Sequence, residues 1–378
     1  MAPLKRYFYN CLSYIIHALN IYVLVIYLNT KFIVIKLKNA ILPAIFCLLL
    51  FFLLLFSKGN LSAAQAGLLL WANHVVPSVL PFFIVTELLN YTNVIPVVGR
   101  LLKKIMRPIF NVPGEGAYAL IMGIIAGYPT GAKIINTFRK ENICTKEEGE
   151  RLLSFTNNSG PLFIVGTIGV SLFSDTRTGI LLFITHLAAS LTVGFLFRFW
   201  KYKRTGSITS TKTHEICPPI RKNATFSNLG EIMANSIMSS INTIVLIGGF
   251  VMLFSVIVNI LNQSYILNII GNILSPIFHI FNIPPEYFSG IITGIMELTN
   301  GVKEVANIAT KFVSINVIIC SFILGFGGIS VLLQVFSITS KSDISIKPYI
   351  IGKFLQGCIA AFYTYVLLYS TPFFNLNL

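Results

Sequence analysis

Residues 41–56 read ILPAIFCLLLFFLLLF, a run of sixteen residues without a charge. With its flanks, this run has the length that crosses a bilayer core of about 30 Å. Similar apolar runs recur at 66–90, 152–172, 178–199, 237–261, 312–337 and 348–369. This pattern is too repetitive for a single signal peptide. It predicts an all-α, polytopic membrane protein.

The composition of the whole chain agrees with this prediction. Of its 378 residues, 55% are hydrophobic and 11% are charged, and the mean hydropathy is +0.79. These values lie outside the range of an ordinary soluble domain. The formal net charge is +15, but the basic residues lie between apolar runs and form no stripe with interleaved aromatic residues. We therefore assign them to cytoplasmic loops and expect no nucleic-acid partner.

Motifs for catalysis or cofactor binding are not found in the sequence. The six cysteines are widely scattered without CxxC spacing, so we expect no metal site and no disulfide framework. The chain has no Ser/His/Asp, Cys/His or HExxH arrangement and no Walker loop. We expect no enzymatic activity and no cofactor, and ATP is not the evident energy source.

Charge divides the chain into segments. Residues 201–222 form its most basic stretch and contain two adjacent prolines, which predicts a cytoplasmic linker at 201–226. We predict a first repeat with a preceding transmembrane helix at 39–200 and a second repeat at 227–378. Residues 1–38 form an N-terminal extension whose structure the sequence leaves open.

The first repeat contains a conflict of charge. The basic cluster at 100–107 and the charged loop at 137–151 both have cytoplasmic character, yet only the apolar stretch 116–136 separates them. That stretch is interrupted by Gly127-Tyr128-Pro129-Thr130-Gly131. A re-entrant helical hairpin, which enters and leaves by the same face, resolves the conflict.

The two halves of the chain resemble each other. A shift of about 171 residues places FNVPGE at 110–115 on FNIPPE at 281–286. In the same register or one residue from it, Gly123 meets Gly294 and Gly131 meets Gly301, so we predict an internal duplication. The second copy lacks the basic cluster, because no Lys or Arg occurs between Lys222 and Lys303. The copies therefore face opposite ways, an architecture typical of secondary transporters.

The tips of the two predicted hairpins are candidates for a binding site. The first tip is followed by Lys133, and the second, which begins at Glu297, is followed by Lys303. Exposed helix ends and nearby lysines suit a carboxylate ligand. Glu297 stands among apolar residues, where a carboxylate usually faces a cavity or a partner. The alternative is that the glycines serve close helix packing and the lysines extend to the membrane interface.

A second pair of breaks is predicted in the apolar runs that follow the hairpins. TNNSGP at 156–161 offers several side-chain donors at one depth, and GFGGIS at 325–330 is rich in glycine. Each copy thus has a re-entrant hairpin and a broken helix, although hydrogen bonds between helices would also explain the polar residues. The predicted substrate-binding residues are Gly127, Tyr128, Pro129, Thr130, Gly131, Lys133, Asn157, Asn158, Ser159, Gly160, Glu297, Thr299, Asn300 and Lys303.

Four of these stretches also carry a resemblance to a known family. VLPFF at 79–83, RPIFNVPG at 107–114, GYPTGAK at 127–133 and EGERLLSFTNNSGPL at 148–162 resemble the YlbJ, or stage V sporulation protein V, family of sporulation integral membrane proteins. The resemblance covers about residues 40–370, and the last two motifs are quite specific. That family carries the Gate, or nucleoside-recognition, domain and is similar to concentrative nucleoside transporters.

The resemblance implies a transporter that moves dipicolinic acid from the mother cell into the forespore across the outer forespore membrane. The partners expected are then this anion and membrane lipid. The resemblance leaves open whether the protein forms a homo-oligomer. One alternative is transport of nucleosides or another small solute, which the Gate domain suggests. Another is a scaffold that transports nothing and recruits a morphogenetic partner through the basic linker.

Overall fold

The computed structural model describes residues 40–89, 91–92, 94–201, 225–309 and 313–371. The predicted N-terminal extension and nearly all of the predicted linker lie outside these residues. The chain forms two compact units, Met1–Asn60 and Leu61–Leu378. In the first, the described part contains the helix Ala40–Leu55, and the Asn60 amide donates hydrogen bonds to the carbonyls of Phe52 and Leu53 at 3.0 and 3.2 Å.

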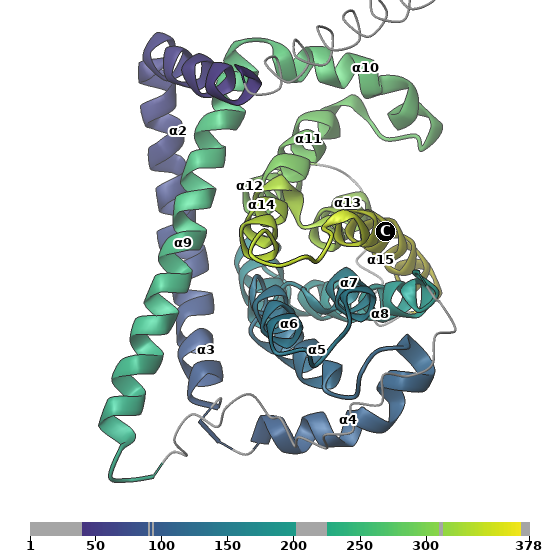
Figure 1. The fold of residues 1–378 in the computed structure, drawn as a ribbon. Helices are drawn as coiled ribbons and strands as arrows, with labels where there is room; N and C mark the ends of the chain where they lie inside the picture. Colours follow the sequence, from purple (N-terminus) through teal and green to yellow (C-terminus); the bar gives the residue numbers. More distant parts are fainter. Residues whose placement is uncertain (1–39, 90, 93, 202–224, 310–312, 372–378) are drawn as a thin grey trace, which may run out of the picture. The chain divides into compact units, whose positions relative to one another are not determined.

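The elements of the described residues are all helical, as the sequence predicts (Figure 1). Their order is α2 (Ser57–Leu70), η1 (Trp71–Val75), α3 (Val76–Leu89), α4 (Val94–Phe110), α5 (Gly116–Ile125), α6 (Thr130–Lys140), α7 (Lys146–Thr156), η2 (Phe163–Leu172), α8 (Thr176–Phe197), α9 (Leu229–Gln263), α10 (Ile266–Ile280), η3 (Pro285–Tyr287), α11 (Phe288–Met296), α12 (Leu298–Ala306), α13 (Val313–Phe326), α14 (Gly328–Thr339) and α15 (Lys347–Ser370).

Four helical spans in the described part are long and apolar enough to cross a membrane: Thr176–Phe197, Leu229–Gln263, Val313–Thr339 and Lys347–Ser370. A fifth results if Ala40–Leu55 and Ser57–Val75 count together as one span. These helices confirm the all-α membrane fold. The predicted run 152–172 differs, because α7 ends at Thr156, residues 157–160 are not helical, and helical structure resumes at Pro161. Polar residues fill the break, and the proline is the first residue of the helix that follows.

The order of elements in the first half is repeated in the second. Each half has the same order: an amphipathic helix, a hairpin of two short helices, a broken helix and a long helix. In the first half these are α4, α5–α6, α7–η2 and α8, and in the second they are α10, α11–α12, α13–α14 and α15. Asn111 and Asn282, which the sequence repeat aligns, both have positive φ angles, of 54° and 51°. The sequence repeat thus corresponds to a repeat of local structure, while the opposite orientation of the copies in the membrane stays a prediction.

The two largest hydrophobic cores of the described residues each contain helices from both halves. The first joins the hairpin α5–α6 and α7 to Val331 and Val335 of α14. The second joins the hairpin α11–α12 and α13 to Ile164 and Ile168 of η2. The helix after each break therefore packs against the hairpin of the other half. Because η2 and α14 each pack against the hairpin of the other half, an arrangement that we call the exchange of these helices, both breaks lie between the two cores.

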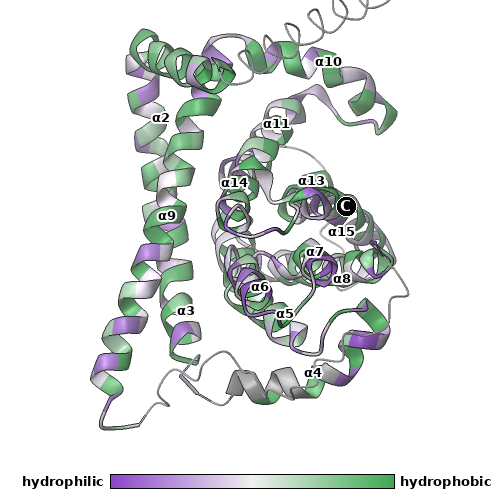
Figure 2. Cartoon of the chain, viewed as in Figure 1, coloured by the Kyte–Doolittle hydropathy of each residue, from purple (hydrophilic) through white to green (hydrophobic). Residues whose placement is uncertain are grey.

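Apolar side chains cover the outside of several helices. Helix α9 lies along α3 (Figure 1) and exposes Met238, Val245 and Leu253. Helix α10 exposes Ile269 and Ile273, and Figure 2 shows the hydrophobic character of both helices. Apolar surface of this extent is what a protein embedded in lipid presents to the hydrocarbon.

Polar contacts connect the two halves at one end of the molecule. The Arg139 guanidinium donates two hydrogen bonds to Asp343, at 2.8 and 3.0 Å, and these hold the pKa of the Asp343 carboxyl below its ordinary value. Glu150 is fully buried and accepts hydrogen bonds from the Trp200 indole at 2.8 Å and the Ser345 backbone N–H at 3.3 Å. It also pairs with Lys201 at 2.9 Å, so one carboxylate joins α7, the end of α8 and the loop before α15.

Replacing Glu150 with alanine is expected to lower the free energy of unfolding by about 2–3 kcal/mol, because two partly buried N–H donors lose their buried acceptor. Thermal unfolding of the purified protein in detergent measures this change. Glu141→Ala is the control, since Glu141 is exposed at the end of α6. Equal midpoints for the two variants would contradict the role given to Glu150.

Candidate functional site

The tip of the first hairpin is an irregular turn. Helix α5 ends at Ile125, and Gly127 has a φ of +69°, a conformation that side-chain-bearing residues rarely adopt. A Cβ at this position would also lie 2.9 Å from the backbone nitrogen of Gly160. Tyr128 follows, and α6 begins at Thr130. The glycine thus brings the hairpin tip against the break between α7 and η2.

The tip of the second hairpin is formed by Glu297. This residue has extended backbone between α11 and α12, and its carboxylate accepts a hydrogen bond from the Asn300 backbone N–H at 2.7 Å. It is therefore the N-cap of α12, where a negative charge is favourable. The Asn300 side chain donates to the Ser255 hydroxyl of α9 at 2.8 Å, which ties the hairpin to that helix.

The two broken helices are interrupted in different ways. In the first, the buried Asn158 amide donates to the Phe155 carbonyl at 2.8 Å and to the Ser190 hydroxyl at 3.0 Å. In the second, Gly327 and Gly328 both have positive φ angles, of 84° and 81°. A Cβ on Gly328 would lie 3.1 Å from the Leu298 nitrogen, so this break lies against the second hairpin tip.

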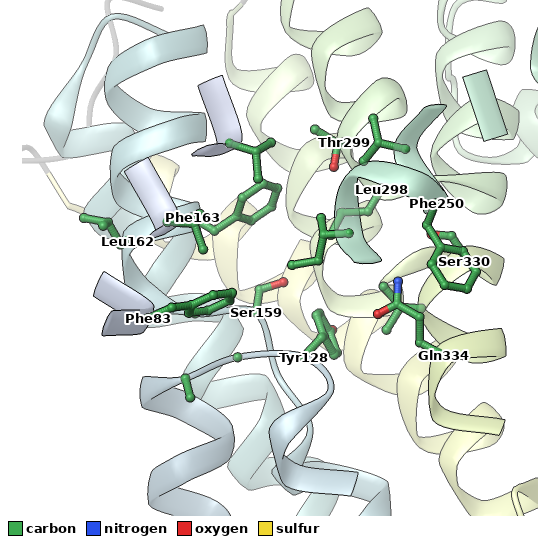
Figure 3. A pocket seen from close by; sticks show the side chains of 18 of the residues that line it. Phe83, Tyr128, Ser159, Leu162, Phe163, Phe250, Leu298, Thr299, Ser330 and Gln334 are labelled. Atoms are coloured by element: carbon green, nitrogen blue, oxygen red, sulfur yellow. The ribbon is translucent and has the colours of Figure 1, made fainter. Parts of the chain in front are cut away.

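A cavity lies where these breaks and tips meet (Figure 3). It contains about 670 Å³ of space between atoms, part of it open to the outside. Its lining residues are Val75, Val79, Phe82, Phe83, Ala126, Gly127, Tyr128, Ser159, Gly160, Leu162, Phe163, Ile247, Phe250, Val251, Glu297, Leu298, Thr299, Ser330, Val331 and Gln334.

The two sides of the cavity differ in character. Helices α3 and α9 contribute apolar side chains such as Phe83 and Phe250, while the tips and breaks contribute the polar groups. The hydroxyls of Tyr128 and Ser159 are buried, lie next to each other and have no hydrogen-bond partner among the described residues (Figure 3). Buried hydroxyls without partners are uncommon, so they are available to a ligand.

Six of the residues predicted from the sequence line this cavity: Gly127, Tyr128, Ser159, Gly160, Glu297 and Thr299. The other eight are not among the lining residues: Pro129, Thr130, Gly131, Lys133, Asn157, Asn158, Asn300 and Lys303. Lys133 is exposed on α6, and Lys303 is partly buried on α12. Whether any of the fourteen binds substrate stays a prediction.

Several residues at or near the cavity were missed by sequence reasoning. The aromatic wall of Phe83, Phe163 and Phe250 comes from runs that read only as apolar. Gln334 and Lys353 carried a usable signal, because each is a polar residue inside an apolar run. In the described residues, no group of three or more His, Cys, Asp or Glu side chains is placed to hold a metal ion.

Comparison with known proteins adds two findings. The family model "Gate: Nucleoside recognition" matches residues 73–200 and 244–342, and these two segments contain every lining residue of the cavity. The chain is also 36% identical over 342 residues to the sporulation integral membrane protein YlbJ of Bacillus subtilis (strain 168). The aligned region covers 88% of this chain and 83% of that relative.

Proposed function

Because this chain belongs to the Gate family of sporulation integral membrane proteins, we propose that it is a transporter of a small anionic solute. The substrate that we propose is dipicolinic acid, moved from the mother cell into the forespore across the outer forespore membrane. Transport would occur through the cavity between the two halves of the chain.

The observation that carries this proposal is the meeting of four helix N-termini at one cavity. Helices η2 and α12 begin at the lining residues Phe163 and Leu298. Helices α6 and α14 each begin two residues from a lining residue, Tyr128 and Ser330 respectively. Each N-terminus has a partial positive charge. The Glu297 carboxylate already caps the N-terminus of α12, and the other three favour an anion. Broken helices that present their N-termini to an anionic substrate are typical of secondary transporters.

The remaining chemistry of the cavity suits a compact aromatic dianion. Phe83, Phe163 and Phe250 offer surface to the flat faces of a ring, and the Tyr128 and Ser159 hydroxyls can donate to a carboxylate. Glu297 opposes an anion, but its carboxylate already accepts a hydrogen bond at the N-terminus of α12. Part of its charge is thereby compensated.

A nucleoside is the second candidate, because the matching family model is described as nucleoside recognition. The apolar wall would accept a base, and the hydroxyl and amide groups of Ser159, Thr299 and Gln334 would accept a ribose. The two candidates differ in charge. An anion requires a positive potential in the cavity, whereas a nucleoside requires only neutral hydrogen-bonding groups.

Uptake of labelled dipicolinate into proteoliposomes that contain the purified protein tests the proposal. We expect saturable uptake above that of empty vesicles, without inhibition by excess nucleoside. A variant with Lys133→Ala and Lys303→Ala measures the contribution predicted for these lysines. Since neither lines the cavity, a loss of uptake in this variant would place part of the substrate path outside it.

Other outcomes would reject the proposal in different ways. Saturable uptake of nucleoside but not of dipicolinate would favour the second candidate. No uptake of either solute, from folded protein inserted in both orientations, would remove the transporter function and favour a scaffold. Deletion of residues 202–224 is a separate test of the two functions: a scaffold that depends on this linker should lose its function, whereas a transporter should retain uptake.

A further inference from the structure

Lys353 is a buried lysine in the second turn of α15. Its relative exposure is 0%, and its ammonium group donates one hydrogen bond, to the Gln356 side-chain carbonyl at 2.8 Å. In the described part of the chain no carboxylate lies within 4.0 Å of it. A buried cation without an anionic partner is costly, and two of its three N–H groups can donate to further partners. Such a residue usually has a function in a membrane protein.

The surroundings of Lys353 explain in part how it is tolerated. The Gln356 side-chain amide, whose oxygen accepts this hydrogen bond, donates in turn through its nitrogen to the side-chain oxygen of Asn158 at 3.0 Å. Lys353 lies near the ends of two helices, α7 and α13. A Cβ on the preceding Gly352 would lie 2.8 Å from the Ser154 carbonyl of α7, and one on Gly327, just after α13, would lie 3.8 Å from the Lys353 side chain. The C-terminal ends of helices have partial negative charge, which stabilises a cation.

One side chain, that of Tyr128, lies next to both this cation and the cavity. The Lys353 nitrogen lies 5.0 Å from the centroid of the Tyr128 ring, and Tyr128 lines the cavity. The Tyr128 hydroxyl forms no hydrogen bond among the described residues. The tyrosine is therefore held mainly by packing and by the cation–π contact, whose strength is about 2 kcal/mol when desolvated. A rotation of this side chain would connect the amine with the cavity.

We propose that Lys353 is the buried cation of the binding site, which pairs with a carboxylate of an anionic solute when the Tyr128 ring moves aside. This inference rests on the proposed function and names the residue that selects an anion over a neutral solute. It assigns a role to α15, which lies outside both segments matched by the family model. Tyr128 acts in it as a partner of the cation in the absence of solute.

Binding measurements on the full-length protein in detergent test this role. The probes are dipicolinate, its neutral analogue pyridine-2,6-dicarboxamide and uridine, with calorimetry as the readout. The variants are Lys353→Met and Lys353→Gln, and the control is Lys347→Gln, because Lys347 is exposed at the start of the same helix. Thermal unfolding is measured for each variant. Replacing a buried charge that lacks an ionic partner should leave the melting temperature equal or higher.

We expect both Lys353 variants to bind dipicolinate about thirtyfold more weakly or worse, since loss of one member of a buried charge pair has effects of this size. Binding of the dicarboxamide should remain, and the control should behave as the wild type. The polar variant carries the test if Lys353→Met does not fold.

Two outcomes would overturn the inference. If the wild type binds dipicolinate and the Lys353 variants bind it within about twofold as well, Lys353 only joins helices and the proposed function stands. If the wild type binds uridine or the dicarboxamide but not dipicolinate, or binds none of the three, the proposed function fails together with the inference.

Discussion

Replacing Gly301 with alanine is expected to prevent the second hairpin from packing and to lower the free energy of unfolding by about 3 kcal/mol or more. A Cβ at this position would lie 2.0 Å from the Gly294 Cα and 2.3 Å from its nitrogen. These are backbone atoms of the facing helix, so no side-chain rotation relieves the contact. Helices α11 and α12 would have to separate, which also displaces Glu297 from the cavity.

The measurement is the yield of monodisperse protein after extraction, together with its midpoint of thermal unfolding. The matched control is Gly249→Ala on α9, where a Cβ would meet no atom within 4 Å. That change should be neutral or should stabilise the protein by up to about 1 kcal/mol. A Gly301→Ala protein that unfolds at the wild-type temperature would show that the two helices are not in close contact.

The same reasoning applies to the first hairpin, where a Cβ on Gly123 would lie 1.6 Å from the Thr156 carbonyl oxygen. We therefore expect Gly123→Ala to be as damaging as Gly301→Ala. The sequence repeat aligns Gly123 with Gly294 and Gly131 with Gly301. In the first hairpin a Cβ on Gly123 or Gly131 would meet the Thr156 carbonyl at the end of α7, whereas in the second a Cβ on Gly301 would meet the backbone of Gly294. Both copies thus use glycine for the same purpose, a close approach of backbones that any Cβ prevents.

Alanine variants of two neighbouring residues, Asn158 and Ser159, are expected to differ strongly in stability. Asn158→Ala removes hydrogen bonds to the Phe155 carbonyl, the Ser190 hydroxyl and the Gln356 amide, all of them buried. We expect a loss of about 3 kcal/mol of stability, because three buried hydrogen bonds disappear together, while the Ser190 hydroxyl still donates to the Phe155 carbonyl. Ser159→Ala removes a hydroxyl that has no partner, so stability should change by less than about 0.5 kcal/mol.

Transport should show the opposite order when each variant is compared at equal amounts of folded protein. The Ser159 hydroxyl lines the cavity, and loss of a hydrogen bond to a charged solute reduces affinity by about tenfold or more. Uptake by folded Asn158→Ala protein should fall less, since Asn158 does not line the cavity. Initial uptake rates at low solute concentration, with the unfolding midpoint of each variant, measure both effects. If Ser159→Ala transports normally and Asn158→Ala does not, the substrate contacts a different part of the break.

The sequence identifies many positions of the site because breaks in apolar runs are costly in a membrane. Gly127, Ser159 and Glu297 stand out for this reason, since each interrupts a stretch that would otherwise be a continuous apolar helix. The same signal cannot tell a residue that faces the cavity from one that faces a neighbouring helix. Asn157 and Asn158 were therefore predicted together with Ser159, although their amides donate to protein groups, Tyr349 and Ser190 among them.

By itself, then, the sequence determined the class of fold, the two hairpin tips, the two breaks and the repeat that relates them. These follow from local composition, because the preference of an apolar run for lipid, the conformational freedom of a glycine and the cost of a buried polar group do not depend on which helices pack together. Only the tertiary structure decided which of these groups meet. The exchange of η2 and α14 between the two cores joins both tips and both breaks at one cavity, and α15 places Lys353 behind Tyr128. Contacts between residues more than two hundred positions apart depend on how whole helices pack, which local patterns do not specify.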